Sequence, residues 1–303
     1  MMIRNLVSRE KTLWRPIFIE TASRVQCFMS FQFVTQDING VSIHYAFDGP
    51  DDAPVITFAH ALSLNARSFN PQVSEFTEDY RVLRLDLRGH GNTDVNGGPF
   101  SVEDLADDVA ALLDHLHVER THFVGSSLGA MAGFAMAFNH ANRLSSLTFM
   151  ASQGALPQER TKTARAGIKA MRASDATPTK TLADECEAML ERLLGDIAEA
   201  DHPNTFALLR EILHDTTLYG QARAYEAILE MNYDSRLSEI DVPTMILAGA
   251  QDSSTPPERM QMYKDGITGA RMEVLDGAGH FPNVEQPAAF NAVLRQFLRE
   301  VSP

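Results

Sequence analysis

The sequence predicts an α/β protein in which a mainly parallel sheet is covered by helices on both faces and carries an inserted helical block. Short, continuously apolar stretches alternate with helix-like stretches before and after a long central segment, as expected for strands buried on both faces. Residues 157–237 hold no convincing strand and are typical of about four helices. Because strands follow this segment, we expect a cap inserted into the sheet and not a separate domain.

The composition is typical of a soluble globular protein, with 44% hydrophobic and 22% charged residues in 303. A formal charge of −14 argues against nucleic acid and anionic membranes as partners. Only two cysteines, Cys27 and Cys186, are present, which favours a reducing, cytoplasmic compartment. We find no run of about 18 apolar residues that would cross a membrane. Both a monomer and a homodimer remain open.

Residues 1–28 differ from the rest of the chain, because basic residues clearly outnumber the acidic Glu10 and Glu20. A transit peptide has such a composition, but the segment lacks a clear amphipathic helix. We expect instead an N-terminal extension that is poorly ordered, with Met29 as the natural start. The expected organisation is then a first part of the core at 29–154, a helical cap at 155–238 and a second part of the core at 239–303.

The elements of the first core segment follow from turn and cap signals. Asn39-Gly40 is a strong type I′ hairpin signal between two β-rich stretches. Ser101, with Asp104 three residues later, is close to a capping box and opens a helix. Apart from the segment described below, we expect strands at 31–36, 41–47, 55–59, 80–86 and 144–151, and helices at 68–79 and 101–117.

The cap and the second core segment are divided by helix-breaking residues. We expect breaks between the cap helices near 174–178, 201–203 and 219–220, where Pro or Gly occurs. The α/β alternation then resumes with a strand at 244–248, a helix near 257–264, a strand at 271–275 and a final helix at 287–301.

The segment 121–133 is the centre of the functional prediction. An apolar strand at 122–124 leads into Gly-Ser-Ser-Leu-Gly and then into a helix at 130–140, so Ser127 lies in the middle of a G-x-S-x-G turn. Gly125 and Gly129 leave room where strand and helix cross. The turn exposes the Ser127 hydroxyl, and the Leu128 amide points to where an oxyanion would form. Ser127 is therefore the candidate nucleophile, with Ser126 as the second choice.

A serine needs a base, and the base needs an acid to orient it. Asp252 follows the strand at 244–248, and His280 follows the strand at 271–275, in a glycine-containing loop. Both therefore lie at the carboxyl ends of parallel strands, where ligands bind in open α/β sheets. We expect Asp252 as the acid and His280 as the base, in preference to Asp241, Asp265 and Asp276 as acids and to His90 as a base.

The loop after the strand at 55–59 should supply the second oxyanion donor, which we expect to be the Leu62 amide. His60, at the start of this loop, is expected to brace it and not to transfer protons. No group of His, Cys and Asp has the spacing of metal ligands, so we expect neither a metal nor a cofactor.

These motifs resemble the α/β-hydrolase superfamily from residue 31 to residue 301. The resemblance rests on G-S-S-L-G, on D-L-R-G-H-G at 86–91, on the order Ser127, Asp252, His280, and on G-A-G-H-F-P-N-V-E-Q-P at 277–287. Within the superfamily, H-A-L-S at 60–63, F-N-P-Q at 69–72 and V-E-D-L-A-D-D-V at 102–109 are similar to 3-oxoadipate enol-lactonase-like esterases. The resemblance implies an eight-stranded sheet, a nucleophile elbow, a catalytic triad and an oxyanion hole.

The resemblance also implies a serine hydrolase that cleaves a small ester or lactone through an acyl-enzyme. We expect His60, Ala61 and Phe281 to contribute to the substrate site. Alternatives are a carbon–carbon bond hydrolase of an aromatic ring-cleavage product, a cofactor-free perhydrolase or acyltransferase, and a catalytically silent ligand-binding protein of the same fold.

The cap offers residues for substrate selection. An enol-lactone with a carboxylate needs a cation, and the cap contains Arg160, Arg165, Arg172, Arg210 and Arg223. Most of these are expected on solvated helix faces. The cap methionines Met171, Met189 and Met231 are expected to fill the core.

Overall fold

The computed structural model describes residues 32–95, 98–172, 181–194, 199–200 and 202–302. The expected extension at 1–28 and the expected cap break at 174–178 lie outside these residues. The described elements belong to a unit that spans Phe33–Pro303.

An eight-stranded sheet forms the centre of this unit, in the order β1-β2-β4-β3-β5-β6-β7-β8. Pairing is antiparallel between β1 and β2 and between β2 and β4, and parallel elsewhere, which confirms the predicted mainly parallel sheet. The strands are β1 (Phe33–Ile38), β2 (Val41–Asp48), β3 (Val55–Ala59), β4 (Arg81–Leu85), β5 (Thr121–Ser126), β6 (Leu144–Met150), β7 (Thr244–Gly249) and β8 (Arg271–Leu275).

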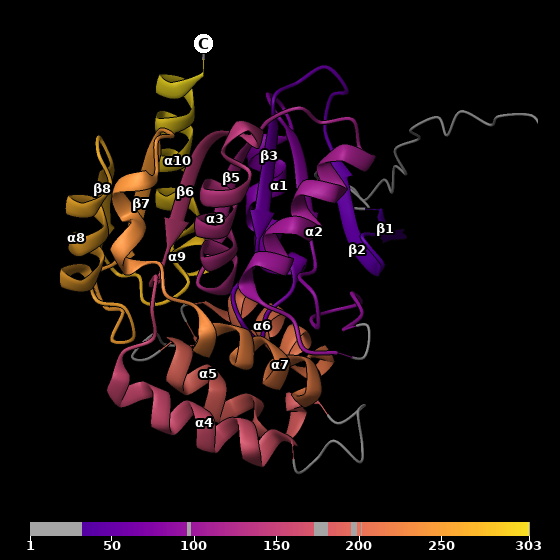
Figure 1. Cartoon of the computed structure of the whole chain (residues 1–303), viewed down its shortest axis with the longest axis vertical. Coiled ribbons are helices and arrows are strands. Elements are labelled where there is room, and N and C mark those ends of the chain that lie inside the picture. Colours follow the sequence, from indigo (N-terminus) through magenta and orange to yellow (C-terminus); the bar gives the residue numbers. More distant parts are fainter. Residues whose placement is uncertain (1–31, 96–97, 173–180, 195–198, 201, 303) are drawn as a thin grey trace, which may run out of the picture. The chain divides into compact units, whose positions relative to one another are not determined.

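Helices cover both faces of the sheet (Figure 1). On one face, the ring of Phe134 in α3 lies 5.7 Å from that of Tyr263 in α8. On the other face, Gln72 of α1 donates to Asn291 of α10 at 3.0 Å. The core helices are α1 (Asn70–Phe76), α2 (Val102–His115), α3 (Leu128–Asn139), α8 (Pro257–Gly266), α9 (Pro282–Glu285) and α10 (Pro287–Val301). Short 3₁₀ helices are η1 (Ala66–Phe69), η2 (Ala141–Arg143), η3 (Leu182–Glu185) and η4 (Asp234–Glu239).

Local signals in the sequence act as expected. Asn39 and Gly40 have φ angles of 53° and 72°, and a type I′ turn requires positive φ at both central residues. Ser101 and Asp104 form a reciprocal capping box at the start of α2.

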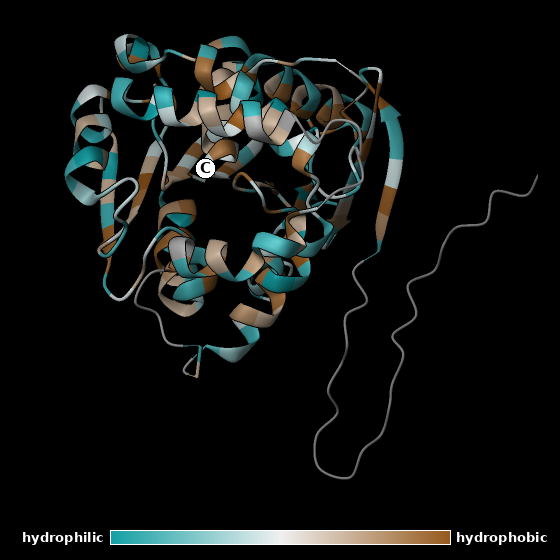
Figure 2. Ribbon diagram, turned by 90° about the horizontal axis from the view of Figure 1, so that it is seen from below, coloured by the Kyte–Doolittle hydropathy of each residue, from teal (hydrophilic) through white to brown (hydrophobic). Residues whose placement is uncertain are grey.

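The helices carry hydrophilic and hydrophobic residues along their length (Figure 2), as amphipathic helices against a sheet do. Among the described residues, none of the helices is long and apolar enough to cross a membrane.

Four α-helices lie between residues 157 and 237 of the described chain, below the carboxyl edge of the parallel strands in Figure 1. They are α4 (Gln158–Arg172), α5 (Cys186–Leu194), α6 (Pro203–Asp215) and α7 (Leu218–Glu230). The two ends of this block meet, because Ala155 bridges Asn232 and the Tyr233 amide donates to the Gly154 carbonyl at 2.7 Å. We therefore propose that residues 155–238 are the cap.

The break predicted near 219–220 lies slightly earlier, at 216–217 between α6 and α7, and α7 runs through both Tyr219 and Gly220. Gly220 serves packing here. A Cβ atom on Gly220 would lie 1.8 Å from the Gly89 carbonyl oxygen, so only glycine allows this helix to approach the core loop so closely. The actual boundary is Thr217, whose hydroxyl accepts from the Gly220 amide as an N-cap.

Candidate active site

Ser127 lies in the sharp turn between β5 and α3, with φ 47° and ψ −106°. A non-glycine residue with positive φ is strained by about 1–3 kcal/mol and persists only where its surroundings hold it. The Ser127 amide donates to the Met150 carbonyl at 3.0 Å, and the Ser152 hydroxyl donates to the Ser127 carbonyl at 2.9 Å. These contacts hold the backbone of the candidate nucleophile on both sides.

The flanking glycines are required by close contacts. A Cβ atom on Gly125 would lie 2.5 Å from the Ala130 nitrogen. One on Gly129 would lie 2.1 Å from the Ala59 carbonyl oxygen of β3. The spacing of the motif is therefore explained by the crossing of β3, β5 and α3, as the sequence predicted.

Asp252 follows β7 and is almost completely buried. Its Oδ1 accepts from the amides of Ser254, at 2.8 Å, and Thr255, at 3.1 Å. Its Oδ2 accepts from the Thr255 hydroxyl at 2.6 Å and from His280 Nδ1 at 2.8 Å. Burial raises the pKa of Asp252. The hydrogen bond and the charge of His280, together with the hydrogen bonds from Thr255, lower this pKa to about 2. The carboxylate is therefore ionised at neutral pH.

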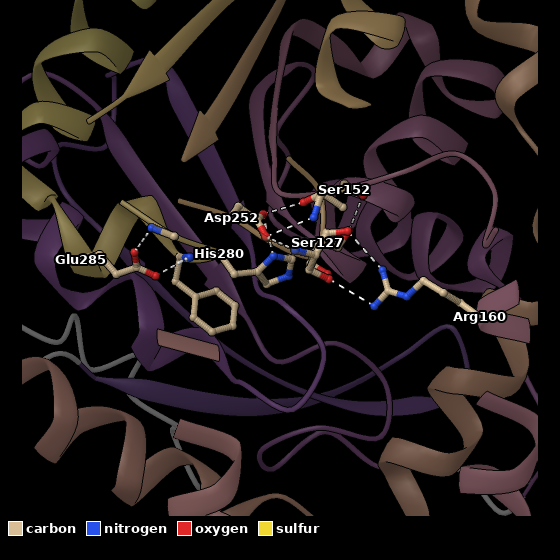
Figure 3. A network of polar contacts seen from close by, with 10 residues as sticks. Ser127, Ser152, Arg160, Asp252, His280 and Glu285 are labelled. Carbon is tan, nitrogen blue, oxygen red and sulfur yellow. Dashed lines mark hydrogen bonds and ion pairs between the residues drawn. The ribbon is translucent and has the colours of Figure 1, made fainter. Parts of the chain in front are cut away.

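His280 follows β8, and the structure brings its ring to Asp252 as predicted (Figure 3). Since Asp252 is an ionised acceptor, Nδ1 carries the proton and Nε2 is left to act as a base. Ser127 and His280 line the same cavity, although these two described residues form no hydrogen bond with each other. Catalytic hydrogen bonds are often long before substrate binds and tighten in the complex.

The loop after β3 is tied to the nucleophile turn, because the Gly129 amide donates to the His60 carbonyl at 3.0 Å. The amides of Leu62 and Leu128, the candidate oxyanion donors, have no acceptor among the described residues. Two free amides at the junction of this loop and α3 are the arrangement that an oxyanion hole needs.

His60 does not line the cavity, so the expectation that it contacts substrate is wrong. Its ring is fully buried, with Nε2 accepting from the Leu87 amide and Nδ1 donating to the Ala61 carbonyl, both at 2.8 Å. Burial lowers the pKa of His60 well below its ordinary value, and the nearby His90 adds to this. A neutral imidazole with a hydrogen bond at each ring nitrogen braces the loop. This agrees with the expectation that His60 braces the loop after β3.

A cavity of about 980 Å³ lies over these residues, between the core and the cap. Ala61 and Phe281 line it, as expected for substrate contacts. Met171 and Met189 line it too, whereas we expected them only to fill the core. Three hydrogen bonds also join the cap to the core beside the cavity. In each one a cap side chain donates to a core carbonyl: Thr216 to Ser63, Arg160 to Ser254 and Thr205 to Val284.

Arg160 is the cap arginine of the described chain that lines this cavity. It donates to the carbonyl and hydroxyl of Ser254, both at 3.2 Å, and has no carboxylate partner among the described residues. The other described candidates have acidic partners: Arg165 has Glu230, Arg210 has Glu187 and Glu199, and Arg223 has Glu226. The side chain of Arg172 lies outside the described residues.

Sequence reasoning missed two residues that bind Asp252 or the backbone around His280. Thr255 donates to Asp252, and its signal is the Asp-x-x-Thr spacing, in which a side-chain oxygen binds nearby backbone amides. Glu285 accepts from the amides on both sides of His280. Its signal is weaker, an acidic residue five positions after the histidine that folds back in a short helix.

Comparisons with known proteins agree with this geometry. The family model described as alpha/beta hydrolase fold matches residues 54–287. The chain is 31% identical to 3-oxoadipate enol-lactonase 2 of Acinetobacter baylyi, over 85% of this chain and 94% of that protein. It resembles the crystal structure of the enol-lactonase from Burkholderia xenovorans, with 30% identity, a TM-score of 0.76, and coverage of 88% of this chain and 100% of that one.

A thermophilic esterase from Thermogutta terrifontis is also similar, with a TM-score of 0.81, 25% identity, and coverage of 90% of this chain and all of the esterase chain. The family model spans the candidate nucleophile, acid and base together with the whole region between them. The chain belongs to the alpha/beta hydrolase fold family.

Proposed function

We propose that this hydrolase cleaves a carboxylic ester or lactone through a covalent acyl-enzyme on Ser127. The observation that carries the proposal is the contact of His280 with the buried, ionised Asp252, in the same cavity as a strained serine turn. A nucleophile, a base within the same site and an acid that orients the base are the elements of a serine hydrolase triad.

In the proposed reaction, His280 Nε2 takes the proton of Ser127 while Oγ attacks the carbonyl carbon. The amides of Leu62 and Leu128 stabilise the oxyanion, and losing one such donor typically costs about 2.7–4 kcal/mol. Asp252 keeps the imidazole oriented and stabilises its cation. The ring then returns the proton to the departing alkoxide, and water, activated by the same nitrogen, releases the acid from Ser127.

We further propose that the substrate is similar to an enol-lactone and carries a carboxylate that binds Arg160. Support comes from the enol-lactonase relatives and from the cavity, where Arg160 contacts Ser254 without an acidic partner. An arginine that is not neutralised attracts an anion, and its planar group can bind both oxygens of a carboxylate.

The test of the nucleophile is hydrolysis of p-nitrophenyl acetate by Ser127→Ala. We expect kcat/KM to fall by about 10⁴ or more, because removal of the nucleophile abolishes the acyl-enzyme. Ser126→Ala is the matched control: the Ser126 hydroxyl is buried without a hydrogen-bond partner, so its loss should leave activity within about threefold. Activity of Ser127→Ala close to that of the unchanged protein would contradict the proposal.

A further inference from the structure

Glu285, the last residue of α9, is buried and bonded on both sides of His280. Its side chain folds back, so that Oε1 accepts from the Phe281 amide at 2.7 Å and Oε2 accepts from the Gly279 amide (Figure 3). Only 1% of the residue is exposed. One carboxylate therefore accepts from the amides of the residue before and the residue after the candidate base.

The rest of the loop is fixed against the strand that carries the acid. The Gln251 amide, next to Asp252, donates to the Ala278 carbonyl at 2.9 Å. A Cβ atom on Gly249 would lie 2.0 Å from the Gly279 carbonyl oxygen, so loop and strand are in direct contact. The backbone before His280 is thus held by β7 on one side and by Glu285 on the other.

The charge of Glu285 has no cationic side chain to neutralise it among the ion pairs of the described residues. The charged groups that act on it are His280 and Asp252. Burial raises the pKa of Glu285 to about 7, although the two amides and His280 act in the opposite direction. A buried carboxylate is costly, and a glutamine would accept from only one of the two amides. A glutamate at this place therefore points to a use for the charge.

We propose that Glu285 is a positioning residue for His280: its carboxylate fixes the amides of Gly279 and Phe281, the residues before and after the histidine, and its negative charge favours the imidazolium formed during catalysis. This inference rests on the proposed function, because it needs His280 to be the base. Glu285 does not touch the reacting atoms and acts through His280.

The proposal has a consequence for the pH dependence of the reaction. Ionised Glu285 accepts from both amides, whereas protonation converts one acceptor into a donor and removes the charge. Activity on the acid side then depends on two protons, one on His280 and one on Glu285. Without Glu285, the acid limb depends on one proton and moves to lower pH, because the carboxyl whose pKa burial raises to about 7 is no longer there.

The test compares Glu285→Gln with the unchanged protein, using p-nitrophenyl acetate between pH 4.5 and 9. In the unchanged protein we expect log kcat/KM to fall on the acid side with a slope that approaches two. In Glu285→Gln we expect a slope of one, a limb shifted to lower pH, and a kcat about tenfold lower on the plateau. Gln286→Ala is the matched control: it removes a contact with the Gly277 carbonyl of the same loop and should leave both profile and kcat unchanged.

An acid limb that is identical in Glu285→Gln and the unchanged protein overturns the proposal. If Glu285→Gln does not fold, the acid-side slope of log kcat/KM in the unchanged protein is sufficient to decide. A slope of one overturns the proposal, because it excludes the ionisation of Glu285. Labelling with a fluorophosphonate separates this outcome from failure of the proposed function. Labelled Ser127 with a single-proton limb rejects only the role of Glu285, whereas unlabelled Ser127 rejects the serine mechanism itself.

Discussion

Thr255 shows how much of the site depends on residues other than Ser127, Asp252 and His280. Its hydroxyl and its amide both donate to Asp252, which also binds His280. Burial raises the pKa of Asp252, and the donors of Thr255 add to the larger effect of His280 in lowering it.

We expect Thr255→Val to lower kcat/KM for p-nitrophenyl acetate by about tenfold, because a hydrogen bond to a charged group contributes about 1.5–3 kcal/mol, only part of it in the transition state. The substitution preserves the shape of the side chain. Thr268→Val, at an exposed position before β8, is the control and should have no effect. Equal activity of the two variants would show that the hydroxyl has no part in holding the acid.

The proposed contact of Arg160 with a substrate carboxylate can be tested with two esters. Mono-p-nitrophenyl succinate and p-nitrophenyl butyrate are of similar size, but only the first carries a carboxylate. We expect Arg160→Gln to lower kcat/KM for the succinate by about 10–100-fold, the value of one charged hydrogen bond, and for the butyrate by less than about threefold. Arg165→Gln, on the same helix and paired with Glu230, is the control. Equal losses on both esters would reject the carboxylate contact.

At the scale of elements, close packing limits the size of the side chains in the unit formed by β5, the following turn and α3. Gly129 lies where α3 passes over the end of β3, and its missing side chain allows this close approach to Ala59. Gly167, in the cap helix α4, has no atom within 4 Å of where a Cβ would lie.

The same substitution should therefore have opposite effects at the two glycines. We expect Gly129→Ala to lower the free energy of unfolding by about 3 kcal/mol, because its Cβ meets the Ala59 carbonyl. Gly167→Ala should raise it by about 0.5–1 kcal/mol, since alanine restricts the unfolded chain and favours a helix. Urea unfolding of both variants measures this. Destabilisation of the two by the same amount would contradict the packing described for α3.

At the scale of the whole molecule, buried neutral histidines link stability to pH. His60 and His90 lie together under the loop after β3, and His122 lies within β5. Burial lowers the pKa of His90 and of His122 from 6.5 to about 4, and that of His60 well below 6.5. The unfolded chain therefore binds more protons between pH 6.5 and 4, and stability falls as the pH falls through this window.

Each histidine contributes up to about 1.4 kcal/mol per pH unit to this fall. Glu285 acts in the opposite direction: burial raises its pKa from 4.5 to about 7, so its contribution is present below pH 4.5 and is lost as the pH rises through 7. Because three histidines oppose one glutamate, we expect a net loss of stability from pH 6.5 to 4.5. His122→Gln should reduce the slope of unfolding free energy against pH, and an unchanged slope would contradict this assignment.

The sequence alone was sufficient for the eight strands and the inserted helices, and it also predicted the contact between Asp252 and His280. These features depend on local signals: apolar strands, an Asn-Gly turn, a capping box and the glycine spacing about Ser127. Signals of this kind act between residues that are neighbours in the chain, so they can be recognised in the sequence without knowledge of the tertiary structure.

Only the tertiary structure decided which groups lie beside the triad. The hydrogen bonds that Glu285 of α9 accepts from the amides around His280 and the cavity position of Arg160 depend on contacts between separate elements. Gly220 makes the same point, because its sequence predicted a break while the approach to Gly89 placed it within a helix. Burial and long-range contact set the use of such residues, and neither is a property of the neighbouring sequence.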